Sequence, residues 1–493
     1  MNLYPETIES PTAKSQMALY CTPGLTLFVN VFSPIRGLIQ VNGRCFAVGA
    51  ENFYEIFKDG TAQFRGAVGN DFQPVTMATN GTAGNQVAIC SAGQIFVFYL
   101  KDTGNNVANT MVGPVGGLQG EAASIQFCDG YGVAQLRALD GTGTNKFQVS
   151  ILEDMTQWNP LSVQQVSAFS ENIGAIIQVF RQLFVLGLNG HSQVYYNSGA
   201  SQYTPFDVIQ GAFMEEGISA PLSVCVLDNA PFWIGGNANG NGIAFRANGY
   251  TPLRISNFAI ETEWATYPKK CTDAIGYSYR DQGHTFWVLR FPSANGGFGK
   301  TWVYDVAAQA WHERGYLSGN GYSGFSAHLS QCHAFAFGLH LVGDWNSGNI
   351  YSMAQGVLTD NGTPIRRLRR APHISSEDQR IFHAQMQVAV EVGDAPQPPL
   401  LDGAGNARAP QMMLRWSDDS GRTWSNEHWT GTGEAGQFLV RAYWNRMGYA
   451  RDRVYEVSMT DPVQWRIIDA YLRANPGFTE PTERYANQIA KMS

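Results

Sequence analysis

The sequence has few charged residues for its length. Of 493 residues, 15% are charged, 44% are hydrophobic and 12% are aromatic, and there are 53 glycines. A disordered chain would instead combine low hydrophobicity with high charge. Many glycines and aromatic residues with few charges favour a turn-rich β protein with large contact surfaces. The length predicts about two to four domains with a sizeable core.

An excess of positive charge is also absent. The formal net charge is −7 and the pI is about 5.7. Proteins that bind nucleic acid through general phosphate contacts are normally basic. The composition therefore argues against a general nucleic-acid binder.

Paired cysteines and long apolar runs are missing as well. The seven cysteines are scattered, odd in number and contain no C-x-x-C pair, which favours reduced thiols over a disulfide framework. The first six residues lack the basic and apolar regions of a signal peptide. No apolar run reaches about 18 residues, so we expect no transmembrane helix. These features predict a protein that folds in the cytoplasm.

One pattern recurs between residues 35 and 355: an apolar strand, a short Gly/Asn/Asp turn, a second strand and a polar stretch. The strand pairs are residues 38–41 with 45–48, 87–90 with 95–98, 177–180 with 183–186, 231–234 with 243–245, 286–289 with 301–304, and 334–337 with 350–351. A weaker unit spans residues 124–151. Their spacing of roughly 45–55 residues is typical of one four-stranded propeller blade, and helical periodicity is nearly absent. We predict an all-β fold with a β-propeller of seven blades, with six or eight as alternatives.

A second β module follows at residues 377–473. Residues 382–392 alternate between apolar and polar side chains, and residues 455–459 do the same, as in half-buried strands. Residues 412–416 and 424–425 flank a tight Asp/Gly turn, and residues 465–472 read as a strand that is apolar on both faces. The module is antiparallel and sandwich-like, and nothing in it resembles an active site.

Several motifs resemble one known family. The run from Arg441 to Leu472 has the pattern R-x-x-W-x-R-x-G-x-A-R-D-R-V-x-E-x₄-D-P-V-x-W-R-I-I-x-A-Y-L. Residues 364–373 form a basic segment, residues 157–160 read Q-W-N-P, and residues 20–25 contain a Pro-Gly motif. Taken together in their order along the chain, these motifs resemble the packaged-DNA stabilisation proteins of short-tailed phages. The resemblance extends from about residue 18 to about residue 473. The residues after Arg473 have no counterpart in that pattern.

The resemblance implies a structural virion protein. Such proteins form a tail hub, or nozzle ring, that joins the portal and adaptor to the tail, closes the DNA channel and retains the packaged DNA. It implies a self-assembled ring, expected as a homohexamer, with adaptor and portal, tail spike, fibre or needle proteins as partners and possible non-specific contact with packaged DNA. The location would be the virion tail after assembly in the host cytoplasm. The alternative is a carbohydrate-active or glycan-binding, sialidase-like propeller protein of a phage tail.

The densest positive run contains Arg366, Arg367, Arg369 and Arg370. We favour an interface role, in which these arginines bind acidic residues of another subunit, such as Glu215 and Glu216 or Glu261 and Glu263. Contact with DNA phosphates and a plain solvated surface remain as alternatives.

Residues 417–424, S-D-D-S-G-R-T-W, match the Asp-box hairpin of sialidase propellers. We predict a structural turn in which Asp419 caps the loop, Gly421 allows the bend and Trp424 packs.

Other catalytic-looking motifs have the wrong context. Residues 294–301 nearly spell a P-loop, but a strand pattern follows where a phosphate-binding helix is needed. His328, Cys332, His333 and His340 fit no zinc spacing, and Glu261 and Glu263 are weak candidates for sugar chemistry. We therefore predict no enzyme activity, no catalytic residues, no cofactor and no metal.

The domain organisation predicted from these patterns has five parts. They are an N-terminal segment (1–34), the propeller (35–355), a linker with the arginine run (356–376), the β module (377–473) and a polar tail (474–493). The sequence does not indicate which surface meets which partner, nor the host.

Overall fold

The computed structural model describes residues 1–8, 15, 17–102, 104, 106–236, 242–320, 324–377, 379–391, 393 and 399–476. Residues 477–493 of the expected polar tail lie outside the described residues. The chain divides into two compact units. The sandwich unit comprises Met1–Gly24, His312–Leu317 and Gln355–Ser493, and the propeller unit comprises Leu25–Trp311 and Ser318–Ala354.

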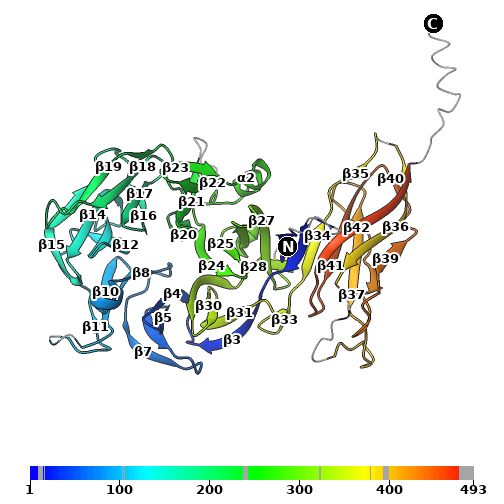
Figure 1. Cartoon of the computed structure of the whole chain (residues 1–493), viewed down its shortest axis with the longest axis horizontal. Coiled ribbons are helices and arrows are strands. Elements are labelled where there is room, and N and C mark those ends of the chain that lie inside the picture. The colour runs from blue at the N-terminus through cyan, green and yellow to red at the C-terminus, as the bar shows by residue number, and fades with distance from the viewer. Residues whose placement is uncertain are drawn as a thin grey trace, which may run out of the picture. The chain divides into compact units, whose positions relative to one another are not determined.

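Antiparallel sheets follow one another along the propeller unit and stand side by side in a ring (Figure 1). The first three are β4 (Ile35–Val41), β5 (Arg44–Gly49), β6 (Asn52–Ile56) and β7 (Ala62–Ala67); β8 (Thr76–Thr79), β9 (Gln86–Ser91), β10 (Gln94–Tyr99) and β11 (Met111–Val112); and β12 (Glu121–Cys128), β13 (Tyr131–Arg137), β14 (Gly143–Ile151) and β15 (Asp154–Gln165). The next three are β16 (Ile173–Val179), β17 (Gln182–Gly187), β18 (Ser192–Asn197) and β19 (Phe206–Met214); β20 (Cys225–Leu227), β21 (Ala230–Gly236), β22 (Gly242–Asn248) and β23 (Thr251–Arg254); and β24 (Ile275–Asp281), β25 (His284–Phe291), β26 (Lys300–Asp305), β27 (Ala310–Leu317) and β28 (Phe325–Ala327).

A further sheet joins the two ends of this unit. It contains β29 (Ser330–Ala336), β30 (Leu339–Asp344), β31 (Asn349–Ala354) and β3 (Gly24–Asn30), with β3 next to β31. A strand that precedes the first sheet in sequence therefore completes the sheet formed by the last strands. Among the described residues the propeller unit has seven sheets.

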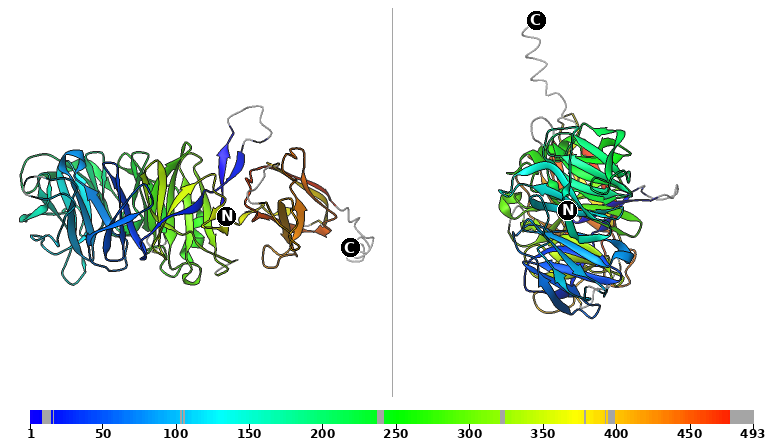
Figure 2. Two further views of the ribbon diagram at one scale, coloured as in Figure 1. Left: turned by 90° about the horizontal axis from the view of Figure 1, so that it is seen from below. Right: turned by 90° about the vertical axis from the view of Figure 1, so that its left-hand side faces the viewer.

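The sequence explains both the strands and the packing between sheets. Asn42 and Gly43 connect β4 to β5 with positive φ values of 50° and 79°, the conformation that a two-residue hairpin requires. Adjacent sheets bury apolar faces against each other. Phe46 and Phe53 stack at 5.2 Å between ring centroids, and both contact the ring of Phe98 from the next sheet at 5.3–5.4 Å. Figure 2 (left) shows the propeller unit from the side, and its strands run from one face of the ring of sheets to the other.

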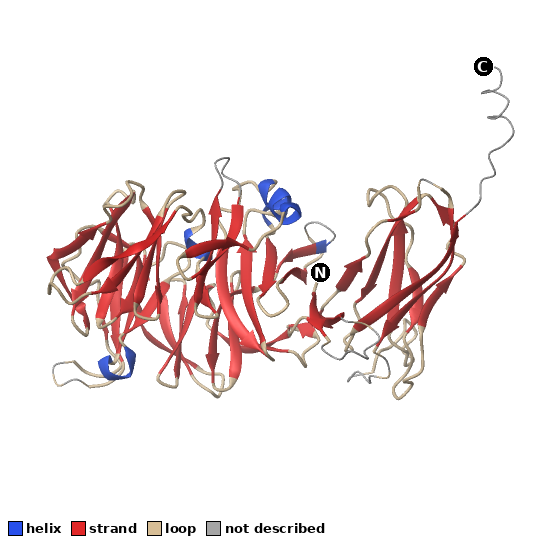
Figure 3. Ribbon diagram, turned by 45° about the horizontal axis from the view of Figure 1, so that its top comes forward, coloured by secondary structure: helices blue, strands red, loops and turns tan. Residues whose placement is uncertain are grey.

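Helices are short and few, as Figure 3 shows. Those of the described residues are α1 (Gly81–Gly84), α2 (Phe258–Ala265) and the 3₁₀ turns η1 (Pro221–Ser223) and η2 (Asn295–Gly297). None is long and apolar enough to cross a membrane within the part of the chain that the structure describes. All seven cysteines are free thiols.

The described residues of the sandwich unit form two large sheets. One has β1 (Leu3–Thr7), β2 (Met17–Cys21), β42 (Ile467–Pro476), β36 (Ile381–Val390) and β39 (Ala442–Asn445), with β40 (Tyr449–Ala450) also paired to β36. The other has β34 (Arg367–Arg370), β41 (Asp452–Met459), β37 (Gln411–Ser417) and β38 (His428–Gly431), with β35 (Ile374–Ser375) also paired to β41. Two short strands, β32 (Thr359–Asp360) and β33 (Thr363–Pro364), pair with each other. Val388, Trp444, Leu414, Val457 and Trp465 share the core between the sheets.

The all-β prediction is confirmed, and the six strand pairs predicted in the propeller region fall in these sheets. In the last pair a strand lies between the two predicted ones, because β29 pairs with β30 and β30 pairs with β31.

The predicted segments 1–34 and 356–376 contain strands. Segment 1–34 contributes β1 and β2 to the sandwich and β3 to the propeller, and segment 356–376 contributes β34 and β35 to the sandwich. Segment 356–376 is predicted as a linker because of its glycine, asparagine and proline and its arginine cluster, and no secondary structure is predicted for segment 1–34, in which β1 contains Pro5. Strands β1 and β34 lie at sheet edges, where proline and exposed charge are tolerated.

Three expectations for the C-terminal strands were wrong. Trp424 and Ser425 are not in a strand, since β38 starts at His428. Strand β41 is buried on both faces rather than one, so Glu456 and Ser458 are buried. Strand β42 starts at Ile467 and has one exposed face, where Tyr471 is 48% exposed.

Candidate interaction site in the sandwich unit

Glu456 lies at the centre of a cross-strand row of charged side chains. Arg370 of β34 is opposite Glu456 of β41, and Arg415 of β37 is opposite Glu456 on its other side. Arg370 Nε donates to Oε2 at 2.6 Å, and Arg415 Nε donates to Oε1 at 2.5 Å. The Glu456 carboxylate is fully buried, so each of its oxygens has the charged donor that a buried acid needs.

The indole of Trp424 covers this row. The Cζ atom of Arg415 lies 4.8 Å from the indole ring centroid, and that of Arg370 lies 5.0 Å from it. Each cation–π contact stabilises by roughly 0.5–2 kcal/mol. Trp424 is half-buried, and both guanidinium groups lie against its ring. The arginine run and the Asp-box loop, far apart in sequence, therefore meet at Glu456.

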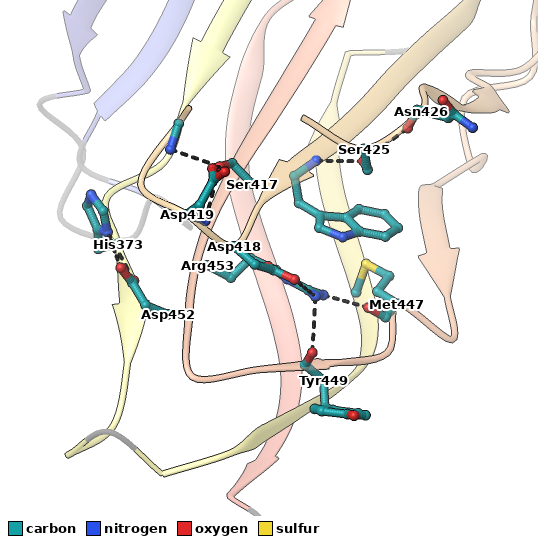
Figure 4. Close-up of polar contacts among 12 residues, drawn as sticks. His373, Ser417, Asp418, Asp419, Ser425, Asn426, Met447, Tyr449, Asp452 and Arg453 are labelled. Atoms are coloured by element: carbon teal, nitrogen blue, oxygen red, sulfur yellow. Dashed lines mark hydrogen bonds and ion pairs between the residues drawn. The ribbon is translucent and has the colours of Figure 1, made fainter. Parts of the chain in front are cut away.

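The Asp-box loop is closed by side chains from within it. Asp419 accepts hydrogen bonds from the backbone N–H of Thr423 at 2.8 Å and from Thr423 Oγ1 at 2.6 Å. It also accepts one from Ser417 Oγ at 2.7 Å, and the two side chains lie next to each other in Figure 4. These donors, with the Thr423 hydroxyl first, hold the pKa of Asp419 well below its usual range. Gly421 has a φ of 89°, which only glycine adopts readily.

A second acid of the Asp-box loop, Asp418, binds a buried arginine of β41. Asp418 forms two hydrogen bonds with the buried Arg453, at 2.6 Å and 2.8 Å (Figure 4). Arg453 also donates to the carbonyl of Met447 at 2.5 Å and lies over the ring of Trp416 at 5.0 Å. The loop is thus held to β41 at two points. Asp418 binds Arg453 of β41 directly, and Trp424 contacts Arg370 and Arg415, which bind Glu456 of β41.

Arg367 is buried, unlike the surface residue that an interface role predicts. It donates to the carbonyls of Val463 at 2.5 Å and Asp461 at 2.9 Å, the turn that contains the Asp-Pro-Val motif. The carboxylate of Asp461 is held in turn by Arg408 at 2.6 Å and 2.8 Å. Arg367 is therefore a fold residue, which strand alternation alone did not reveal.

The remaining two arginines differ from each other. Arg366 donates to Glu427 at 3.2 Å and is 19% exposed. Arg369 is exposed, and its side chain makes no hydrogen bond or ion pair with the described residues. Of the four predicted interface residues, Arg369 has a guanidinium available to a partner, and Arg370 is 40% exposed beside it.

Two of the acidic residues predicted to bind the arginine run, Glu261 and Glu263, bind residues of their own chain. Glu261 accepts from Arg254 Nε at 2.7 Å, and Glu263 binds Lys300 and the hydroxyl of Tyr267.

Lys300, the lysine of the P-loop-like stretch, begins strand β26 rather than a helix. Of the four cysteine and histidine candidates, His333 and His340 lie 3.0 Å apart, between His333 Nε2 and His340 Nδ1, and no group of three metal-ligating side chains occurs in the described ranges.

A cavity of about 600 Å³ lies between the first strands of the propeller sheets. Its lining is mostly apolar and includes Arg36 and Arg137. Arg36 is paired with Asp71, and Arg137 Nε donates to Glu121 at 2.9 Å. Its arginines are thus neutralised within the chain, which does not favour a phosphate site.

Sequence reasoning missed Glu456, Arg415 and Arg453. Period-two alternation predicts that Glu456 faces solvent on a half-buried strand, because the pattern is the same when a covering loop buries the polar face. The spacing of Arg370, Arg415 and Glu456 in the sequence gives no sign that they share one row.

Comparisons with known proteins agree with this two-part architecture. A family model described as "Bacteriophage P22 Gp10, beta-propeller" matches residues 1–357, and one described as "Bacteriophage P22 Gp10, beta-sandwich" matches residues 366–475. No curated protein matches the chain.

Several solved structures are similar in part. The computationally designed Ika8 protein is 12% identical with a TM-score of 0.36, over 66% of this chain and 99% of that chain. The N-terminal domain of Nup159 is 10% identical with a TM-score of 0.40, over 72% and 98%. The extracellular domain of the putative one-component system BT4673 from B. thetaiotaomicron is 10% identical with a TM-score of 0.43, over 85% and 48%.

Proposed function

The chain belongs to the bacteriophage P22 Gp10 family, and from that membership we propose that it is a tail hub that joins the portal and adaptor to the tail and retains packaged DNA. As a family member it is a structural protein of a phage, and the resemblance seen in the sequence is confirmed. The observation that carries the proposal is that both the propeller and the sandwich of one family match, in order, within one chain.

The mechanism we propose is assembly rather than chemistry. A ring, expected as a hexamer, requires a heterologous contact in which two different surfaces meet and the rotation closes. Arg369 and the exposed part of Arg370 offer one such surface on the edge strand β34. An arginine on an edge strand both discourages uncontrolled strand pairing and binds carboxylates of a neighbour.

The isolated chain is expected to be mainly monomeric at micromolar concentration. An adaptor platform would raise the local concentration of copies and so drive ring closure through modest contacts. Light scattering of the purified chain tests this point, and a stable ring without any partner would contradict the role of the platform.

The decisive experiment is complementation of particles that lack this protein. Wild-type chain should restore particles that keep their DNA protected from added nuclease, and Arg369→Glu should lower its incorporation. Arg422→Glu, at another exposed arginine of the sandwich unit, is the matched control. Full DNA retention without the chain would refute the proposal, and normal incorporation of Arg369→Glu with leakage of DNA would favour the DNA-facing alternative.

A further inference from the structure

A cavity of about 500 Å³ opens in the propeller unit near the turns that end β20, β24 and β29. Asp281, Tyr279, His333, Phe335 and His340 are among the residues that line it. It lies outside the Glu456 row and outside every motif on which the proposed function depends. Its chemistry can therefore be considered independently.

Three polar side chains, His333, His340 and Asp281, lie in a row along the cavity wall. His333 Nε2 lies 3.0 Å from His340 Nδ1, which is a hydrogen bond. His340 Nε2 lies 4.0 Å from Asp281 Oδ1. A separation of 4.0 Å is too long for a direct hydrogen bond, so an atom of a ligand or a water can bridge it. The side chains of His340 and Asp281 are 17% and 20% exposed, and the gap is thus reachable from solvent.

The direction of the hydrogen bond between His333 and His340 follows from His333, the most buried residue of the row. Burial lowers the pKa of His333 to about 3, and a backbone hydrogen bond with Ser278 acts in the opposite direction. A backbone carbonyl that accepts a ring N–H has this effect, so the contact favours the tautomer of His333 with its proton on Nδ1. A neutral imidazole has a single N–H, and His333 Nε2 is therefore an acceptor.

The same reasoning fixes the tautomer of His340. Its Nδ1 must donate to His333, which leaves Nε2 without a proton. Burial lowers the pKa of His340 as well, although the charge of Asp281 opposes this effect. With Nδ1 of His340 donating to His333, the gap is flanked by two acceptors, the Nε2 atom of His340 and the carboxylate of Asp281.

Aromatic rings form the wall beside this gap. Phe335 is 55% exposed, and its ring centroid lies 4.9 Å from that of His340. The Tyr279 ring lies 5.8 Å from His340 on another side. Ring faces attract cations electrostatically. Arg280 also lines the cavity, but successive residues of a strand point to opposite faces, which directs it away from Asp281.

We propose that this cavity binds a primary aliphatic ammonium group. Such a group has three N–H donors and a positive charge, so it can donate to His340 Nε2 and to Asp281 together while its alkyl chain contacts Phe335. An alcohol has one donor and cannot satisfy both acceptors, and a quaternary ammonium has none. A free amine and a lysine side chain of another protein carry the same group.

The test is a ligand-observed NMR titration of the full chain at pH 7.5. The probes are n-butylammonium, N,N,N-trimethylbutylammonium and 1-butanol. The dissociation constant of n-butylammonium should be at least tenfold lower than that of either control. Equal binding of the trimethyl analogue or of butanol, or no binding of n-butylammonium, would overturn the proposal. Titrations with 1,4-diaminobutane and with Nα-acetyl-lysine methylamide then distinguish the two sources of the group.

Variants assign the binding to this cavity. Asp281→Asn should weaken n-butylammonium binding at least tenfold. Asp228→Asn is the matched control, because Asp228 lies in the corresponding turn of the preceding sheet and is paired with Arg246. If thermal unfolding shows that Asp281→Asn is misfolded, Phe335→Ala at an exposed ring replaces it and should weaken binding as well. Unchanged binding in a folded Asp281→Asn variant, or equal loss in Asp228→Asn, would place the amine elsewhere and refute the site.

Discussion

Arg370 and Glu456 face each other across β34 and β41, with 2.6 Å between Arg370 Nε and Glu456 Oε2. This contact connects the arginine run to the middle of a sandwich sheet. Part of the positive charge that the sequence offers to a partner is therefore used inside the chain, and the contributions to folding and to assembly can be separated by mutation.

Glu456→Gln should lower the free energy of unfolding by about 2–3 kcal/mol. This is below the roughly 3–5 kcal/mol for breaking a fully buried pair, because Arg370 and Arg415 keep access to water. Urea denaturation with tryptophan fluorescence measures the change. Glu434→Gln, at an exposed position, is the control and should leave stability unaltered. Equal stability of the two variants would mean that the row does not stabilise the sandwich.

Arg367→Gln and Arg369→Gln should behave differently despite their similar positions in sequence. Arg367→Gln removes the donors to the Asp461 and Val463 carbonyls and should cost about 2–4 kcal/mol. Arg369→Gln should change stability by less than about 0.5 kcal/mol, as is usual for an exposed residue, while lowering incorporation into particles. A stable Arg367 variant with poor incorporation would show that Arg367 serves the interface after all.

Asp419→Ala should open the Asp-box loop locally. The folded-state pKa of Asp419 is depressed, so its stabilising effect is present above the ordinary value of about 3.9 and is lost as pH falls toward the folded-state pKa. Hydrogen exchange of the Thr423 amide at neutral pH should accelerate in the variant. Asp402→Ala removes a similar cap in another loop and should not affect Thr423. Persistent protection in the Asp419 variant would assign the closure of the loop to Gly421 and Trp424 alone.

Gly343→Ala should strain the packing between the last and the first propeller sheets. A Cβ atom on Gly343 would lie 2.3 Å from Ile35 Cγ2 and 2.8 Å from Cys332 Sγ. Overpacking of this kind costs about 1–3 kcal/mol. Combining it with Ile35→Ala should cost less than the sum of the single changes, with a coupling of about 0.5–3 kcal/mol. Additive effects in a double-mutant cycle would show that the two sheets do not contact at this point.

The sequence predicts the propeller strands well because their apolar runs are buried between neighbouring sheets and glycine or asparagine turns connect many of them. It predicts edge strands poorly. Strand β34 contains three arginines and β1 contains a proline, and both patterns are those of loops. The Glu456 row is not readable from sequence, since its members come from three strands and its burial depends on a loop that folds over them. Two elements of the site, the arginine run and the Asp-box loop, were recognised separately, but their contact was not.

The position of β3 in the last propeller sheet, and of β1 and β2 beside β42, has a consequence for synthesis on the ribosome. Strand β3 is translated early, yet its neighbour β31 ends at Ala354, and β2 pairs with β42 near residue 467. Neither unit can complete its pairing until most of the polypeptide has left the exit tunnel. Long-range pairing of this kind is slow and leaves strand edges open in the meantime. The nascent chain is therefore vulnerable to aggregation and chaperone capture throughout translation, and premature termination shortly before β42 would leave the first hairpin without its partner strand.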